Sequence, residues 1–254
     1  MTMTMTMTMT TTATAIPFPR LLRAEFRKAT DTRAARWLLA AAVLLALAAL
    51  AVPLVFPRDV TQDRASFLTW AALGLSRLLP IALMLTMTAE WSQRTALTTF
   101  TLEPRRRRVL VAKVVASLAI SVIGGCLAFA IAQAGLGVAQ ADGRHPALAW
   151  SWPELAGFAA FVILTGAIGS AIGSAVHNTA AAIVTYFALA AVTSLLLIPA
   201  VEQAGSWVNT GETFGWMLAG QWSGHGAQIA SSALLWIALP LTIGAIRIAR
   251  RDIH

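Results

Sequence analysis

The sequence predicts an all-α, polytopic membrane protein with six transmembrane helices, an N-terminal amphipathic connecting helix and both termini in the cytoplasm. Hydrophobic residues make up 57% of the 254 residues and charged residues 12%, and the mean hydropathy is +0.70. Soluble domains are only about 45–50% apolar. Six apolar runs are long enough for membrane helices, which need about 20 residues each. Little sequence remains for a domain outside the membrane.

Two segments precede the first apolar run. Residues 1–18 begin with Met-Thr repeats and carry no charge, so we expect a disordered tail. The transmembrane domain, 19–254, begins with a predicted interfacial helix over 19–36. Its apolar stripe consists of Leu22, Phe26 and Ala29. Basic residues surround this stripe: Arg20, Arg23, Arg27, Lys28 and Arg33. Such a helix rests at lipid headgroups; the alternative is a solvated basic stretch that only follows topology rules.

The positions of the basic residues predict the orientation of the spans. We place the spans at about Trp37–Phe56, Phe67–Ala89, Val109–Gly137, Leu155–Val176, Thr179–Ala200 and Ile229–Ile248. Fifteen of the 19 basic residues precede the first span, lie between the second and third or at the start of the third, or lie near the C-terminus, whereas Arg58, Arg64 and Arg144 lie on the other side. Arg and Lys are retained in cytoplasmic loops. This asymmetry also explains the net charge of +8 without a nucleic-acid partner.

One basic residue, Arg77, falls within the second predicted span, three residues before Pro80. A charge inside a span costs several kcal/mol in lipid and often marks a functional site. Two interpretations are open: the side chain reaches the outer headgroups, or it lines a path for a transported molecule.

Small residues in the fourth predicted span favour close helix packing. Gly166, Gly169 and Gly173 include a GxxxG pair, which lets helix backbones approach in lipid. The partner helix belongs either to this chain or to a second copy. The neighbouring serines do not match the GxSxG pattern of a hydrolase nucleophile.

The external segment 201–228 is rich in tryptophan and glycine. Trp207, Trp216 and Trp222 favour the membrane–water boundary. The segment is therefore predicted to be membrane-associated, either as an interfacial anchor or as a lid over an exit path.

Several function classes lack their residues in this sequence. The chain carries no P-loop, since neither Lys28 nor Lys113 closes a GxxxxGK pattern. Its single cysteine and scattered histidines predict no metal site. The six predicted spans contain no Asp, Glu or His pair for intramembrane catalysis or proton relay. We therefore expect a protein that is not itself an enzyme and has no catalytic residues.

The loop 90–108 and the residues that follow it carry the most specific motif. The stretch Glu90–Lys113 reads EWSQRTALTTFTLEPRRRRVLVAK: a Glu, an Arg-Thr four residues on, a Thr- and Leu-rich run, Pro104, an arginine block and a Lys in the next span. This order resembles the permease subunits of bacterial type-2 ABC transporters. The stretch RAEFRKATDTRAARWLL resembles the connecting helix before their first span. One departure is Arg94, where many relatives have Gly.

The resemblance implies a coupling helix in this loop that docks on a separate ATPase subunit, with Glu90, Arg94, Thr95 and Thr98 as candidate docking or support residues. The arginine block has a second explanation in positive-inside topology and lipid contact. The predicted interfacial set is Arg23, Arg27, Lys28, Arg105, Arg106, Arg107, Arg108 and Lys113.

The resemblance further implies a multi-pass exporter of the bacterial plasma membrane with a cavity lined by the second and fifth predicted spans. The fifth span is nearly all apolar, which favours an amphipathic or hydrophobic cargo, such as a drug, lipid or antibiotic peptide. Two permease chains, as a homodimer or a heterodimer, would pair with two ATPase subunits, which bind the ATP and Mg²⁺; this chain is expected to bind no cofactor. Candidate path residues are Arg77, Thr185, Tyr186 and Thr193. The alternatives are an ATPase-independent channel or transporter, and a structural membrane protein.

Overall fold

A computed structural model describes residues 16–93, 95, 98–99, 101, 103, 105–147, 151–195 and 205–250. Of the predicted disordered tail at 1–18, only residues 16–18 belong to this set. The described chain is helical, apart from one isolated β-bridge between Asp63 and Ala147.

The first two helices meet at a threonine cap. α1 spans Phe18–Asp31 and α2 spans Arg33–Val55. The backbone of Thr32 between them is extended, and its Oγ1 accepts a hydrogen bond from the N–H of Ala35 at 3.2 Å. A threonine at this position satisfies one of the N–H groups that the first helical turn leaves without a partner. The amphipathic helix therefore turns directly into the first long apolar helix.

The buried face of α1 differs from the predicted apolar stripe. Leu21, Glu25 and Ala29 are buried, whereas Leu22 and Phe26 are half-buried. The predicted stripe, which was expected to rest at lipid headgroups, thus lies beside the face that packs on the protein and shares only Ala29 with it. The packed face includes an acidic side chain, and the partners of that side chain give the reason below.

Five helical segments are long and apolar enough to cross a membrane, which makes the chain a multi-pass membrane protein by helix length and hydropathy. They are α2; α3 (Arg64–Ala71) with α4 (Leu73–Ser92); α6 (Arg106–Ala141); α7 (Trp152–Val176); and α11 (Trp222–Ala233), the π-helical turn η1 (Leu234–Ala238) and α12 (Leu239–Arg250) taken together. The first four and the last of the predicted spans fall on these segments.

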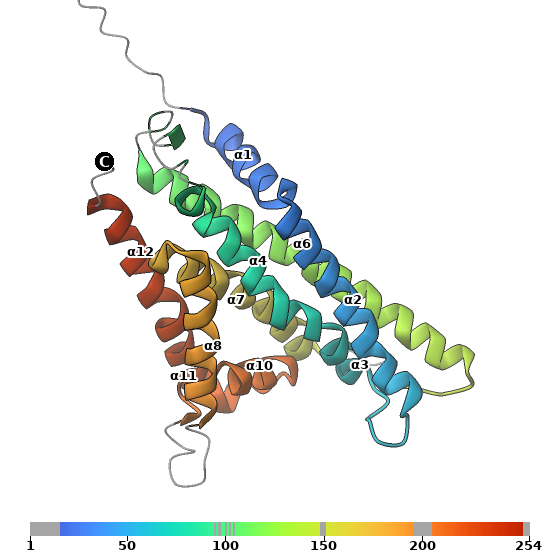
Figure 1. Ribbon diagram of the computed structural model, residues 1–254. Coiled ribbons are helices and arrows are strands. Elements are labelled where there is room, and N and C mark those ends of the chain that lie inside the picture. Colours follow the sequence, from blue (N-terminus) through green and yellow to red (C-terminus); the bar gives the residue numbers. More distant parts are fainter. Residues whose placement is uncertain are drawn as a thin grey trace, which may run out of the picture.

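The remaining predicted span is found only in part. It begins as α8, Thr179–Leu195, which has 17 residues, and its predicted end at residues 196–200 lies outside the described residues. Five candidate spans are thus found and a sixth is not shown. α8 nevertheless runs along the bundle from the turn after α7 toward the end that carries α10, Thr210–Leu218 (Figure 1).

The glycines of α7 pack this central helix against two neighbours. A Cβ atom on Gly169 would lie 2.7 Å from the carbonyl oxygen of Pro80 in α4, and Gly173 meets the same helix one turn further on. Gly166 instead faces α6, where a Cβ atom would overlap the hydroxyl of Ser121. These approaches all lie within one chain, and they require a residue without a side chain.

Basic residues gather at one end of the bundle. α1, the start of α6 and the end of α12 lie together there (Figure 1), and we name this the basic end. The Arg and Lys residues of this end include Arg20, Arg23, Arg27, Lys28, Arg33, Arg36, Arg105, Arg106, Arg107, Arg108, Lys113 and Arg247. α10 lies at the opposite end, crosswise to the long helices (Figure 1).

The outer faces of several helices are apolar and exposed. The larger of these side chains include Leu44, Leu47, Val184, Phe187, Val192, Leu239 and Ile243. Exposed apolar surface of this extent is unusual on a soluble protein. It suits a chain whose solvent is lipid, where helices satisfy their own backbone hydrogen bonds.

Candidate functional site

The candidate site lies at the basic end, where α1 rests against the start of α6. Leu21 of α1 packs with Val109 and Ala112 of α6, and Ile16 and Phe18 cover this small apolar contact. The contact fixes α1 along one side of α6. It therefore sets which polar side chains of the two helices meet the end of α4.

Two carboxylates and two ammonium groups meet beside this contact. We name Glu25, Lys28, Glu90 and Lys113 the charged cluster; they come from α1, α1, α4 and α6. Glu25 lies 2.7 Å from the Nζ of Lys28 and 2.9 Å from the Nζ of Lys113. Glu90 lies 3.1 Å and 3.5 Å from the same two nitrogens. Each acid thus contacts both lysines, and three helices are joined.

Three of the four side chains in the charged cluster are largely buried, so their charges have to be balanced within the cluster. The exposed fractions of the side chains are 3% for Glu25, 6% for Glu90, 10% for Lys113 and 48% for Lys28. An isolated buried charge is costly, whereas a buried pair with further hydrogen bonds is tolerated. Thr99 supplies such a bond, since its Oγ1 donates to Oε1 of Glu90 at 3.0 Å. Pairing with the lysines thus explains why Glu25 belongs to the buried face of α1.

The cluster also changes the acidity of its most exposed member. Partial burial lowers the pKa of Lys28, but the hydrogen bond from Lys28 to Glu25 and the negative charges of Glu25 and Glu90 raise it by more. The net result is a pKa above the ordinary lysine value. Lys28 therefore stays charged at neutral pH.

A third buried acid lies between the loop and α6. Glu103 is 3% exposed, and its Oε2 lies 3.1 Å from Nη1 of Arg108. The other terminal nitrogen of Arg108 donates to the backbone oxygen of Ile16 at 2.9 Å. Nearby, Arg106 donates to the backbone oxygen of Ile248 in α12 at 3.1 Å. Two of the four block arginines thus hold the two ends of the described chain against the start of α6.

The last turn of α4 contacts α8 on its other side. The hydroxyl of Thr179, the first residue of α8, lies 2.6 Å from that of Thr88 and 2.9 Å from that of Ser92. Trp91 meets the ring of His177 edge to face at 4.8 Å, in the turn between α7 and α8. The same turn of helix therefore touches α1 and α6 through Glu90, and α8 through hydroxyl groups.

The residues predicted to couple to an ATPase lie in two different environments. Glu90 is buried in the charged cluster, while Thr95 and Thr98 are exposed. The N–H of Thr95 donates to the backbone oxygen of Glu90 at 2.9 Å, so the loop leaves α4 through a tight turn. Arg94 lies outside the described residues. Arg105 and Arg107 are exposed at the other end of the loop.

The predicted path residues lie on α4 and α8. Arg77 is exposed on α4, and the hydroxyl of Tyr186 donates to the backbone oxygen of the adjacent Ser76 at 3.5 Å. Thr185 is half-buried, and Thr193 is buried with its hydroxyl bonded to its own helix. The structure therefore brings Arg77 and Tyr186 near one another but does not gather all four residues at one point.

Sequence reasoning missed three members of the site. Glu25, Thr99 and Glu103 were not singled out, although Glu25 is an acid three residues before Lys28 within a basic helix, and Glu103 directly precedes a proline. Neither of these two sequence features predicts that the glutamate side chain is buried. Among the described residues no group of His, Cys, Asp and Glu could hold a metal ion.

The fold and site together define a class: an all-α, multi-pass membrane protein with a buried charged cluster at its basic end. Comparison with protein-family models, with curated proteins and with solved structures found no match. A more specific function therefore has to be inferred from the residues of this chain and their geometry.

Proposed function

We propose that the chain is the permease subunit of an ATP-driven exporter of the type-2 ABC class. In this proposal α8 completes a sixth span, both termini are cytoplasmic and the membrane is the bacterial plasma membrane. Two permease chains, identical or different, pair with two copies of a separate ATPase subunit that binds ATP and Mg²⁺.

The observation that carries the proposal is the position of the last turn of α4. The loop 90–108 begins in this turn, which contacts α1 and α6 through Glu90 and α8 through Thr88 and Ser92. A displacement of the loop would therefore be transmitted to four helices, α1, α4, α6 and α8. Such a joint suits a transporter that switches between two rigid arrangements of its helices.

Burial divides the proposed coupling residues into two roles. Glu90 supports the loop from inside the charged cluster, because a side chain that is 6% exposed has little surface to offer a partner. The exposed Thr95 and Thr98 form the proposed docking surface. Arg94, which lies outside the described residues, is proposed as a coupling residue from the motif alone. The exposed Arg105 and Arg107 contact lipid headgroups or the ATPase.

The proposed cargo path runs along α4 and α8 of both copies. Arg77, Thr185, Tyr186 and Thr193 are its candidate polar residues, and most of the surrounding surface is apolar. An apolar lining favours an amphipathic or hydrophobic cargo, such as a drug, lipid or antibiotic peptide. The exposed apolar side chains of α8 also suit contact with a second permease chain.

The decisive experiment is purification of the tagged full chain in mild detergent, with identification of copurifying proteins and an assay of ATP hydrolysis. We expect an ATPase subunit in equal amount and hydrolysis by the complex. A chain that purifies alone in detergent and in nanodiscs, and that still transports after ATP depletion, would overturn the proposal in favour of an ATPase-independent transporter. A chain that purifies alone and transports nothing would point to a structural role.

A pair of threonine variants tests the docking surface. Thr95→Arg places a bulky cation on the proposed contact, and Thr61→Arg places the same side chain on an exposed residue of the loop between α2 and α3. We expect Thr95→Arg to lose the ATPase and the transport activity while membrane abundance is unchanged, and Thr61→Arg to keep all three. Equal recovery of the ATPase with both variants would remove the loop from the interface.

A further inference from the structure

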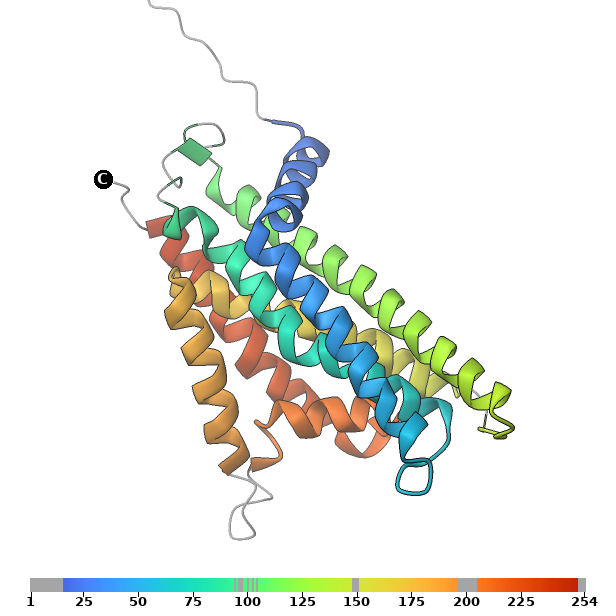
Figure 2. The ribbon, with the colours of Figure 1, turned by 45° about the vertical axis from the view of Figure 1, so that its right-hand side comes forward.

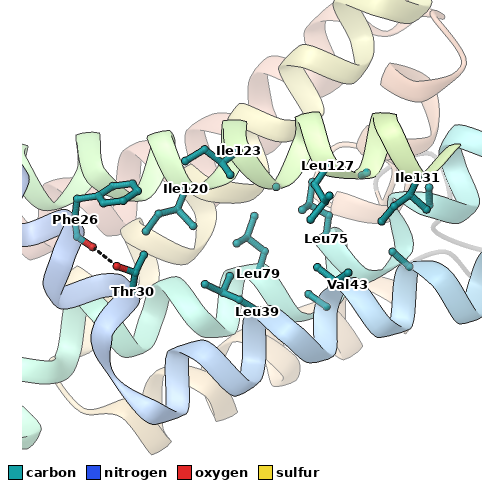
Figure 3. A pocket seen from close by; sticks show the side chains of 15 residues that line it. Phe26, Thr30, Leu39, Val43, Leu75, Leu79, Ile120, Ile123, Leu127 and Ile131 are labelled. Carbon is teal, nitrogen blue, oxygen red and sulfur yellow. Dashed lines mark hydrogen bonds between the residues drawn. The ribbon is translucent and has the colours of Figure 1, made fainter. Parts of the chain in front are cut away.

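An apolar cavity of about 220 Å³ lies between α1, α2, α4 and α6. Figure 3 shows side chains from these helices directed toward one another around it, including Phe26, Leu39, Leu79, Ile120 and Leu127. The lining has one hydroxyl group, that of Thr30, and this group donates to the backbone oxygen of Phe26 at 3.1 Å. The cavity thus presents hydrocarbon and no polar group in need of a partner.

The cavity opens toward the lipid-facing surface between α2 and α6. On the α6 side, Ile123 is 57% exposed and Leu127 is 43% exposed although both line the cavity. α2 and α6 run side by side in both views (Figures 1 and 2), so the opening forms a groove along the bundle. A flexible apolar chain in the bilayer can enter this groove from the side.

The length of the groove matches the depth of one lipid leaflet. Its lining on α6 extends from Ile120 to Ile131, which at about 1.5 Å per residue corresponds to about 16 Å. The hydrocarbon core of a bilayer is about 30 Å thick, so one leaflet contributes about 15 Å. An acyl chain that enters at one surface would therefore reach the far end of the groove.

An exposed arginine lies near one mouth of the groove. Thr30 and Phe26 mark this mouth at the basic end, where the chain turns from α1 into α2. Arg36 precedes the lining residues Leu39 and Val43 by three and seven positions, which places it on the same face of α2 one turn nearer the end. Arg33 and Arg36 are exposed, and among the described residues neither forms an ion pair.

We propose that this groove binds one acyl chain of an anionic phospholipid from the leaflet at the basic end, with the lipid phosphate held by Arg36. The apolar groove supplies affinity for the chain, at a gain that grows with each buried methylene group. Arg36 supplies the preference for an anionic headgroup, since a guanidinium group forms paired hydrogen bonds with phosphate. The bound lipid would cover the side of the main apolar core that α1, α2 and α6 leave open. This site does not depend on an ATPase partner.

Native mass spectrometry of the purified chain tests the proposal. The protein is incubated with equal amounts of phosphatidylglycerol and phosphatidylcholine of identical acyl chains, and bound lipids are counted. Val43→Trp fills the groove, whereas Leu44→Trp adds the same side chain to the neighbouring exposed position, which lies outside the lining. We expect one tightly retained lipid in the wild type and in Leu44→Trp, and its loss in Val43→Trp.

A charge variant tests the headgroup half of the proposal. Arg36→Gln should reduce the preference for phosphatidylglycerol about fivefold, the ratio expected for one basic residue at an anionic surface. Arg20→Gln, at an exposed position away from the groove, should leave the preference unchanged. An unchanged preference in Arg36→Gln would overturn the assignment of Arg36 to the headgroup.

A second pair keeps the test decisive if Val43→Trp does not fold. Ile123→Trp blocks the groove from α6, and Val138→Trp is an exposed control further along the same helix. Equal lipid retention in Ile123→Trp, Val138→Trp and the wild type would show that the retained lipid lies elsewhere and would overturn the proposal.

Discussion

The Nζ of Lys113 lies 2.9 Å from Oε2 of Glu25, so a buried ion pair joins the first third of α6 to the middle of α1. Lys113 also lies 3.5 Å from Oε1 of Glu90 at the end of α4. One lysine thus contacts acids from two other helices. The amphipathic helix is thereby attached to the bundle by specific pairing and not only by its position at the membrane surface.

Replacement of Lys113 by Met should destabilise the protein much more than replacement of Lys28 by Met. Lys113→Met leaves two buried carboxylates that share one half-exposed lysine, and removal of one partner from a buried ion pair costs about 3–5 kcal/mol. Lys28 is 48% exposed, so water screens its pairs and the expected loss is about 1 kcal/mol or less. Thermal unfolding in detergent measures both. Equal shifts for the two variants would contradict the buried arrangement.

The contribution of Lys28 should be lost only at strongly alkaline pH. Its pKa is raised in the folded protein, so its stabilising effect is complete below the ordinary lysine pKa of 10.5 and decreases as pH rises through the higher folded value. The difference in melting temperature between wild type and Lys28→Met should therefore be constant between about pH 7 and pH 9 and shrink above about pH 10.5. A difference that already vanishes near pH 8 would show that Lys28 is not paired.

Replacement of glycine by alanine should have different effects in two membrane helices. Gly169→Ala places a Cβ atom 2.7 Å from the carbonyl oxygen of Pro80, and such overpacking costs about 1–3 kcal/mol because α4 and α7 must separate. In Gly137→Ala the new Cβ atom meets nothing within 4 Å, and alanine is the better helix former. We expect a lower melting temperature for the first variant and an unchanged or slightly higher one for the second. Equal melting temperatures would place the glycine face of α7 in lipid.

The arginines of the block 105–108 should differ in their effect on stability, because some of them pair with buried groups and others are exposed. Arg108→Gln removes the ion pair of Glu103 and the hydrogen bond to the backbone of Ile16, leaving a carboxylate that is 3% exposed without its cation. Loss of such a partner costs about 1–3 kcal/mol. Arg107→Gln changes an exposed side chain and should have no measurable effect on stability. Chemical denaturation of both variants in detergent checks this, and equal stability would contradict the role of Arg108.

Much of the site could not be read from the sequence because its residues are far apart in the chain. Glu90 was singled out for a motif, yet neither its partners Lys28 and Lys113 nor the participation of Glu25 was predicted. Helical periodicity reports which residues share a face of one helix, but it does not report which other helix covers that face. For the same reason the sequence did not predict that α1 packs on the bundle through Leu21, Glu25 and Ala29.

The sequence by itself determined that the chain is helical and apolar enough to cross a membrane several times, because helix length and hydropathy are local properties set by the bilayer. It also located the glycines that allow close packing. Only the tertiary structure decided that Gly166 faces α6 while Gly169 faces α4. It alone decided that Glu25, Glu90 and Lys113 meet in one cluster. Pairing of this kind depends on how three separate helices are placed, and the cost of leaving a buried charge without a partner then holds them together.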